Sequence, residues 1–436
     1  MSASTSSLLK TCGFICSLSL ICASSFATDL VLQKVPPITV AQVPAYPENL
    51  ARYYHGAALE APNGTAITDL RLSSKSDDTN TAVAALLCDD PTVGYALPAG
   101  NTTVLISFPK IENVDTISFL NHGTKGAVKI AIASAKLPAD SPQWREVSEQ
   151  KLAGSVLRAK IGPAEAKYVR LTFDVATHGR IAGFGIYSTP ALSAFTMPRA
   201  RNFTATEKSD TFGLIRYSLT DVHAKSRALY VSSGDDPVQA NNMIDGQPAS
   251  TYTFAAADST PATIVDLGKV TTLRRISALY SPRHAAVDFY VLQSLPGSQA
   301  APESLRLSES TVSNLTPVGS VLDEGAGRAA VDFPEMTGRY ILVKWTPTVR
   351  EDAAFTVAEI SAFGKNTKSL IAANTSASSR TGIMSDGKTV SEGKDLGLGK
   401  DGKEIPAEGP PAEGPPTGLP QPPPFVFVPL VQPTSE

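Results

Sequence analysis

The stretch TIVDLGKVTTLRRISAL (263–279) has a counterpart earlier in the chain, VLISFPKIENVDTISFL (104–120). Four further blocks flank both stretches in the same order. They pair DLRLSS (69–74) with ALYVSS (228–233), LLCDDPTVGY (86–95) with NMIDGQPASTY (242–252), KYVRLTF (167–173) with RYILVKW (339–345), and RIAGFGIYST (180–189) with TVAEISAFGK (356–365). Five blocks in one order predict an internal repeat of about 160–175 residues. The alternative is generic strand composition, which imitates one or two such blocks.

The blocks themselves are typical of β-strands. In YVRLTF (168–173), Val169, Leu171 and Phe173 alternate with polar or exposed positions, which is the period-2 pattern of a strand with one buried face. Long windows with helical periodicity are missing, and the best helical candidate, 47–58, is short. Many short strands separated by turn residues predict an all-β protein made of two jelly-roll β-sandwiches.

The order of the blocks also resembles a known family. An Asp-rich turn leads to an aromatic residue, DLGK (266–269) ends a strand, and AEISAFG (358–364) closes the second copy. This order resembles tandem discoidin domains, also called coagulation factor V/VIII type C domains, which are galactose-binding-like β-sandwiches. The first copy departs from the pattern, with SFPK (107–110) in place of DLGK and Gly183 where Glu359 stands. The fold carries many functions on its loops, so the resemblance implies architecture more than activity.

The chain divides into four segments. Residues 1–27 carry one charge, Lys10, then an apolar run and the small residues Ser25 and Ala27, which predicts a cleaved signal peptide. An uncleaved membrane anchor is the alternative. The next segments are a first sandwich with an N-terminal extension (28–190), a second sandwich (191–365) and a tail (366–436). We therefore expect an exported protein, periplasmic or extracellular, with no membrane span in the mature chain.

The tail has a different composition from the rest of the chain. Prolines occupy eleven positions between Pro406 and Pro433, after a polar stretch rich in Ser, Thr, Gly and Lys. Such a segment buries too little apolar surface to fold, so we expect disorder or polyproline II structure. Its last part, 420–436, contains the apolar run FVFVPLV (425–431). That run either docks on a protein partner or folds back on its own sandwich.

Composition and motifs exclude several classes of function. The 436 residues contain 38 Lys+Arg and 41 Asp+Glu, a net charge of −3 that does not suit a nucleic-acid-binding protein. Three of the four cysteines lie in residues 1–27, so the mature chain keeps Cys88, for which burial is the better interpretation and interchain pairing the alternative. The sequence contains no G-x-S-x-G, H-E-x-x-H, P-loop or C-x-x-C motif, so we expect no enzyme activity. An active site of another kind is the alternative.

The resemblance implies candidate binding residues in the loops at one end of each sandwich. Discoidin-like lectins hold sugars there with aromatic, His, Asn and Arg side chains. The matching positions are Asn121 and His122 in the first copy and Tyr280, Arg283 and His284 in the second. The alternative is that they are ordinary polar loop residues.

The resemblance also implies a candidate metal site in the second copy. Related sandwiches hold a structural Ca²⁺ near the Asp-rich turn, closed by a Glu on the last strand. Asn242, Asp245 and Glu359 are the matching oxygen ligands. The first copy has Asp89 and Asp90 but no matching Glu, so no site is expected there. The alternative for Asp245 is a plain Asp-Gly turn. No other cofactor is expected.

Together these features predict an exported, non-catalytic binding protein that recognises carbohydrate or another cell-surface polymer. The alternative is an envelope assembly factor that docks on partner proteins through its sandwiches and its apolar C-terminal end.

Overall fold

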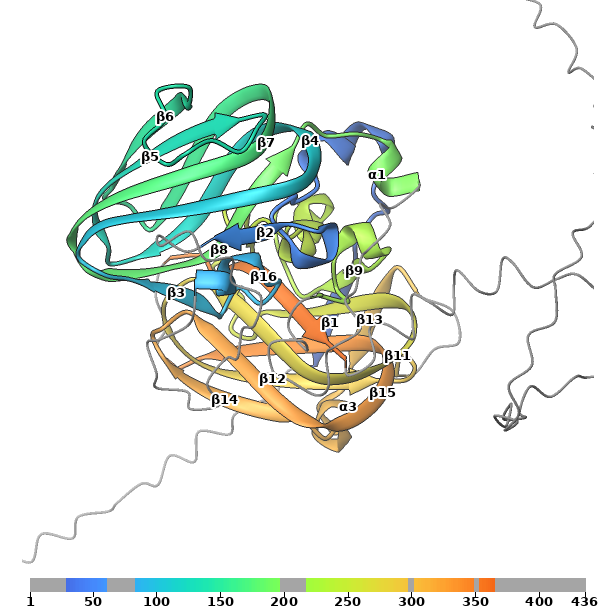
Figure 1. Ribbon diagram of the computed structural model, residues 1–436. Coiled ribbons are helices and arrows are strands. Elements are labelled where there is room, and N and C mark those ends of the chain that lie inside the picture. The colour runs from blue at the N-terminus through green and yellow to red at the C-terminus, as the bar shows by residue number, and fades with distance from the viewer. Residues whose placement is uncertain (1–28, 61–82, 197–216, 297–301, 349–352, 365–436) are drawn as a thin grey trace, which may run out of the picture. The chain divides into compact units, whose positions relative to one another are not determined.

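The computed structural model describes residues 29–60, 83–196, 217–296, 302–348 and 353–364. The predicted signal peptide, block 69–74 and the tail 366–436 lie outside these residues. The described chain is built mainly of antiparallel strands in two sheets, and its helices are short (Figure 1). The prediction of an all-β fold is confirmed. Among the described residues, no helix is long and apolar enough to cross a membrane.

The first sheet contains seven strands in the order β3-β8-β4-β7-β5-β6, with β2 paired to β4. Their bounds are β2 Ala58–Glu60, β3 Gly94–Leu97, β4 Gly100–His122, β5 Lys125–Ala133, β6 Arg145–Leu152, β7 Val156–Thr177 and β8 Gly179–Ser188. The expected alternation in 168–173 is confirmed, because Val169, Leu171 and Phe173 are fully buried.

Two long strands turn the first sheet into a sandwich. The β4–β7 ladder shifts register between Ser107 and Glu112. Before the shift β4 also pairs with β2, and after it β4 pairs with β8 (Figure 1). A bulge of this kind bends a strand and lets it contribute to two layers. Apolar side chains from both halves of β4, such as Ile106 and Phe119, meet in one core with Phe173 and Phe184.

The second sheet repeats this pairing order. It runs β10-β16-β11-β15-β12-β14, with β9 paired to β11, and β1 and β13 extend it beyond β9. The bounds are β1 Leu30–Lys34, β9 Arg227–Val231, β10 Tyr252–Thr253, β11 Ala262–Tyr280, β12 His284–Leu292, β13 Ser304–Leu307, β14 Gly319–Glu324, β15 Arg328–Pro347 and β16 Thr356–Phe363. Trp345 is fully buried in its core, beside Phe254 and Phe355.

Strand β1 corrects the assignment of the whole N-terminal extension to the first sandwich. Leu30 to Gln33 pair with β13, and Gln33 and Lys34 pair with β9, so β1 belongs to the second sheet. The physical reason is the alternation of buried Leu30 and Leu32, which pack in a small cluster with residues of β9, β11 and β13.

The described helices are short, with at most eight residues, and connect strands. Their bounds are η1 Val40–Ala45, η2 Tyr53–His55, η3 Val83–Leu87, α1 Ser193–Thr196, η4 Val222–Ala224, η5 Pro237–Ile244 and α3 Glu309–Asn314. The helical candidate 47–58 forms only the turn η2. Cys88, which follows η3, is 5% exposed, as predicted, and burial raises the pKa of its thiol to about 12.

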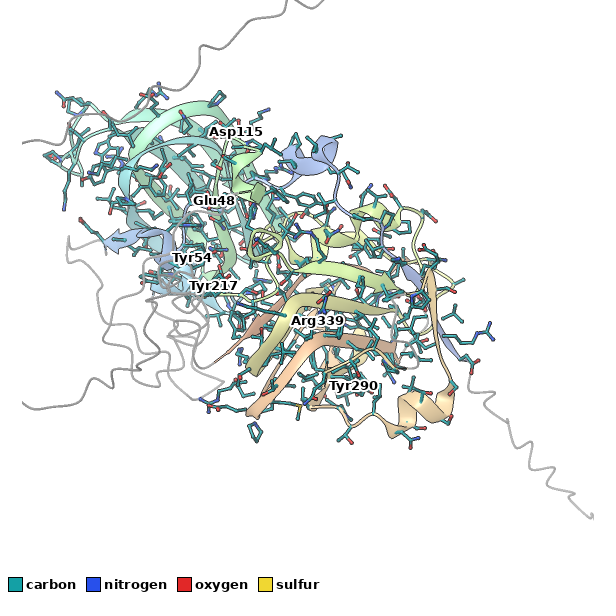
Figure 2. All side chains as sticks on the ribbon, turned by 90° about the vertical axis from the view of Figure 1, so that its right-hand side faces the viewer. Glu48, Tyr54, Asp115, Tyr217, Tyr290 and Arg339 are labelled. Carbon is teal, nitrogen blue, oxygen red and sulfur yellow. The ribbon has the colours of Figure 1, made fainter. Side chains whose placement is uncertain are left out.

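Side chains of the two sheets meet in direct contacts. Leu120 at the end of β4 packs with Leu279 of β11 and Ala358 of β16. The rings of Tyr54 and Tyr217, which precede the first and second sheets, lie edge to face with centroids 5.2 Å apart (Figure 2).

Candidate functional site

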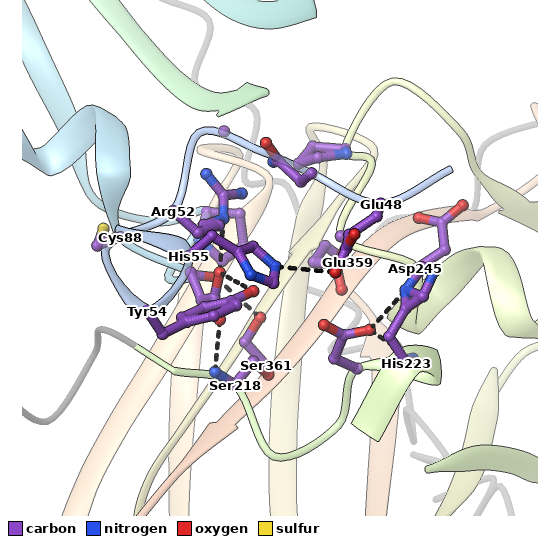
Figure 3. Close-up of a pocket in the computed structure, with 17 residues that line it drawn as sticks. Glu48, Arg52, Tyr54, His55, Cys88, Ser218, His223, Asp245, Glu359 and Ser361 are labelled. Carbon is purple, nitrogen blue, oxygen red and sulfur yellow. Dashed lines mark hydrogen bonds and ion pairs between the residues drawn. The ribbon is translucent and has the colours of Figure 1, made fainter. Parts of the chain in front are cut away.

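A polar pocket lies where segments of the two sheets meet (Figure 3). It is lined by the segments that precede each sheet, the two Asp-bearing turns, and strands β8 and β16. The lining residues are Glu48, Asn49, Arg52, Tyr54, His55, Cys88, Asp89, Pro91, Gly183, Ser218, Asp221, His223, Asp245, Gly246, Pro248, Glu359 and Ser361. Its space for water-sized molecules is about 30 Å³, which is room for about two waters or one small ligand group.

Two similar turns bring the titratable side chains to the pocket. Turn η2 ends at Gly56 and turn η4 ends at Lys225, and both end residues have left-handed backbone (φ 81° and 72°). Asp221 caps η4, because its carboxylate accepts a hydrogen bond from the backbone N–H of His223. The turns therefore present His55 and His223 from matching places before the two sheets.

Arg52 and Asp89 form the basic side of the pocket. Arg52 Nε lies 2.6 Å from Asp89 Oδ1, and Nη1 donates to the carbonyls of Ala51 (3.1 Å) and Phe184 (2.7 Å). Asp89 Oδ2 accepts from the backbone N–H of Ser218 at 2.7 Å. Burial acts to lower the pKa of Arg52, but the Asp89 carboxylate, together with Tyr54, Tyr187 and Cys88, outweighs it, and the pKa is raised. The guanidinium thus stays charged and is held by Asp89.

Asp245 and Glu359 form the acidic side. Asp245 accepts hydrogen bonds from the Gln247 backbone (2.8 Å), from Gln247 Nε2 (3.1 Å) and from Ser250 Oγ (2.7 Å). Glu359 is 4% exposed, and its buried Oε2 atom has no hydrogen-bond partner within the part of the chain that the structure describes. Burial raises the pKa of both carboxyls well above their usual range, and the charge of Asp245 raises that of Glu359 further.

Two histidine–carboxylate pairs complete the lining. His55 Nε2 lies 3.2 Å from Glu48 Oε1, and His223 Nδ1 lies 3.3 Å from Asp221 Oδ1. The other ring nitrogen of His223 lies 3.2 Å from the carbonyl of Tyr46. Each imidazole is therefore oriented by a neighbouring acceptor.

The predicted calcium ligands do not converge as a set. Asp245 and Glu359 both line the pocket, but Asn242 does not; its Nδ2 atom donates to the carbonyl of Thr251 at 3.3 Å. Within the described residues, no three His, Cys, Asp or Glu side chains are grouped to hold a metal ion. Asp245 also makes the hydrogen bond expected of a plain Asp-Gly turn, the alternative interpretation, because its carboxylate accepts from the backbone N–H of Gln247 two residues further along the chain.

In the first sheet, the position that corresponds to Glu359 is Gly183, and Pro248 packs against it. Gly183 has φ +53°, and a β-carbon there would lie 2.8 Å from Pro248 Cγ. Asp89 is bound to Arg52, and Asp90 accepts from Arg275 and Thr92. No side chain larger than hydrogen fits at Gly183 without displacing Pro248, which explains why this position differs from Glu359.

Three of the five predicted ligand-binding residues have structural roles. Asn121 is buried, donates to the carbonyls of Thr124 and Gly154, and accepts from the N–H of Thr124. The Tyr280 ring stacks on Phe355 and its hydroxyl donates to Asp323. Arg283 is buried, donates to the carbonyl of Ala353, and lies over the Phe355 ring. The polar atoms of these three residues thus serve the loops themselves, and ligand binding by them stays a prediction.

The other two, His122 and His284, are exposed, and His284 lies beside the turn between β14 and β15. A β-carbon on Gly325 of this turn would lie 3.7 Å from His284 Nε2. Partial burial and the guanidinium of Arg328, at the other end of the turn, lower the pKa of His122. The structure thus places His284 beside this turn and His122 within electrostatic range of Arg328. We call His122, His284 and Arg328 the loop cluster.

Sequence reasoning missed the pocket residues Glu48, Arg52 and His55. They lie in the extension before the first sheet, which the repeat pattern does not cover. The available signal was a second histidine-bearing segment, RYYHG (52–56) before one sheet and TDVHAK (220–225) before the other.

Comparisons with known proteins give a fold likeness only. No protein-family model matches the chain, and no curated protein matches it. A Ruminococcus gnavus GH29 fucosidase in complex with fucose is 15% identical with a TM-score of 0.28, covering 35% of this chain; the chain spans only 29% of the fucosidase's length. A striped bass (Morone saxatilis) serum F-lectin is 14% identical over 73% of this chain and 98% of the lectin (TM-score 0.25). Allantoicase from Saccharomyces cerevisiae is 12% identical over 75% and 99% (TM-score 0.24). Likenesses at this level carry no function over to this chain.

Proposed function

We propose that the protein is an exported, non-catalytic binding protein for carbohydrate, built from tandem discoidin-like sandwiches, and that the loop cluster contacts the ligand. The observation that carries the proposal is that exposed His284 lies beside the turn that ends at Arg328, and that the charge of Arg328 also acts on exposed His122 of the other sheet. Ligand contacts of many folds lie on such loops, held by a rigid scaffold.

The chemistry of the loop cluster favours a carbohydrate that carries negative charge. A guanidinium binds carboxylate, sulfate or phosphate groups with two parallel hydrogen bonds. The lowered pKa keeps His122 neutral at neutral pH, so its ring offers one donor and one acceptor, as a sugar hydroxyl requires. Glu324 pairs with His284 in the sheet and is exposed. Its carboxylate would repel an acidic group of the ligand, which opposes the attraction of Arg328.

A glycan array with the mature protein tests this proposal. We expect binding to acidic glycans above their neutral counterparts. Arg328→Gln should weaken that binding roughly 10-fold or more, since a hydrogen bond to a charged group contributes about 1.5–3 kcal/mol. Arg158→Gln removes the same charge from an exposed position on β7 and is the matched control.

Two outcomes contradict the proposal. One is equal loss of binding in both arginine variants, which would indicate unspecific charge attraction. The other is the absence of glycan binding together with capture of a partner protein that requires residues 420–436. That result would support the assembly function in its place.

A further inference from the structure

Glu359 differs from the other carboxylates of the pocket. Asp89, Asp221, Asp245 and Glu48 each lie against at least one donor or cation, as described above. Glu359 is more than nine-tenths buried and lines the pocket (Figure 3), and its Oε2 atom has no hydrogen-bond partner among the described residues. A buried polar atom without a partner costs free energy of about 1–3 kcal/mol, and more for a charged group. The position therefore calls for a donor that the protein itself does not supply.

The charge around Glu359 specifies a cationic donor. With every titratable group ionised, the pocket would hold five carboxylates against one guanidinium and two imidazolium rings, a net charge of −2. The guanidinium of Arg52 is held by Asp89 and two carbonyls. The negative charges of Asp245, Asp221 and Asp89 act together to raise the pKa of Glu359 beyond the effect of burial. A cation at Oε2 would relieve that repulsion.

The donor set suits an ammonium group better than a divalent metal. Ca²⁺ takes six to eight oxygen ligands, and the described residues hold no group of three metal-binding side chains. Both oxygens of Asp245 already accept hydrogen bonds. A primary ammonium needs only about three acceptors and tolerates varied directions. The 30 Å³ of space admits such a group with its first carbon.

We propose that this pocket binds the ammonium group of a small primary amine, with the Glu359 carboxylate as its buried counter-ion. The part of the chain that the structure describes does not repeat this site at Gly183, because Pro248 fills the corresponding space. This proposal does not depend on the carbohydrate function, since the loop cluster and the pocket share no residue.

Methylammonium chloride is the probe for the test, with tetramethylammonium chloride as a ligand of the same charge that has no N–H donor. At constant ionic strength and pH 8, methylammonium should raise the melting temperature of the full chain and tetramethylammonium should not. Calorimetry should give one site per chain. Glu359→Gln keeps the shape of the side chain and should weaken methylammonium binding at least 10-fold. Glu149→Gln, at an exposed strand position, should bind as the wild type does.

A measurement on the wild-type protein guards against a folding defect in the variant. A nuclear Overhauser effect between the methyl protons of methylammonium and the Glu359 side chain would support the site directly. Calcium chloride is the competing probe: stabilisation by calcium that requires Glu359, with no methylammonium effect, overturns the proposal in favour of a metal site. No response to either cation overturns it in favour of a pocket that holds water.

Discussion

Replacing Asp90 by alanine tests how strongly contacts between the two sheets stabilise the fold. Arg275 of β11 contacts two carboxylates at nearly the same distance. Its Nε lies 2.8 Å from Asp90 in the first sandwich, and its Nη1 lies 2.9 Å from Asp332 in its own sheet. The Asp90 side chain is 0% exposed, whereas that of Asp332 is 63% exposed. One guanidinium therefore offers an internal comparison of a buried and an exposed ion pair.

The expected magnitudes differ because burial removes the screening by water. Breaking a buried pair by removing one partner costs about 3–5 kcal/mol. Asp90→Ala also removes the acceptor for the backbone and hydroxyl of Thr92, although Arg275 keeps Asp332. We therefore expect a loss of about 3 kcal/mol for Asp90→Ala. Asp332→Ala should lose at most about 1 kcal/mol, as exposed pairs do.

Urea unfolding followed by tryptophan fluorescence is the assay. Trp144 lies in the first sandwich and Trp345 in the second, so the signal reports on both. Arg275→Met in each background completes a double-mutant cycle and isolates the pair from the Thr92 contacts. Equal losses for Asp90→Ala and Asp332→Ala, or a coupling energy near zero for the buried pair, would refute the reasoning.

Three further results are expected. The urea concentration at the unfolding midpoint should be higher for Glu359→Gln than for the wild type at pH 8, and the same for both at pH 4. A difference between the two midpoints that stays constant across pH contradicts this. Cys88 should resist iodoacetamide in the native state at pH 8, because its pKa is raised to about 12, and should react once unfolded, as peptide mapping would show. Gly183→Ala should destabilise by about 2–4 kcal/mol, since it adds a clash with Pro248 to left-handed strain. Gly162→Ala has the same sign of φ and open space, so it should cost only about 1–2 kcal/mol.

The sign of the Glu359 effect follows from linkage. Its folded pKa is raised above the ordinary value of 4.5, so the folded state holds the proton more tightly than the unfolded state. Its contribution is fully present below that value and is lost as pH rises through the folded pKa. Each pKa unit corresponds to about 1.4 kcal/mol. The charged groups that face Glu359 from the surrounding elements are Glu48, Arg52, His55, Asp89, Asp221, His223 and Asp245. The pKa of Asp245 is also raised, so its contribution to the free energy of unfolding falls with rising pH in the same way.

Much of the fold could be predicted from periodicity. Alternation in 168–173 predicts which side chains of β7 are buried, because a half-buried strand needs an apolar residue at every second position. Strand β1 could not be placed in the same way. Its own alternation, with Leu30 and Leu32 buried, specifies a strand but does not identify the sheet. The partner strands β9 and β13 lie about 200 or more residues further along the chain, and only the folded structure shows that pairing.

The candidate sites were harder to predict, since a residue type does not reveal how its polar atoms are used. Asn121 and Arg283 have the chemistry of ligand contacts, yet both are buried and hydrogen-bonded to backbone carbonyls of nearby loops. His122 and His284, in contrast, remain at the surface. Predicting the difference requires knowing which loop carbonyls lack donors, which is a property of the folded loop.

The two sheets share one order of strand pairing but differ where they meet, and this difference locates the pocket. Position 183 carries no side chain and is covered by Pro248, while the matching position 359 carries a buried carboxylate. A purely structural junction would be expected to remove such a carboxylate, because apolar groups of similar volume stabilise at least as well as buried charges. Three neighbouring carboxylates, Asp245, Asp221 and Asp89, make its ionisation more costly still. A buried acid that weakens the junction is consistent with a role in binding, since the ligand that neutralises it would also bind the two sheets more firmly together.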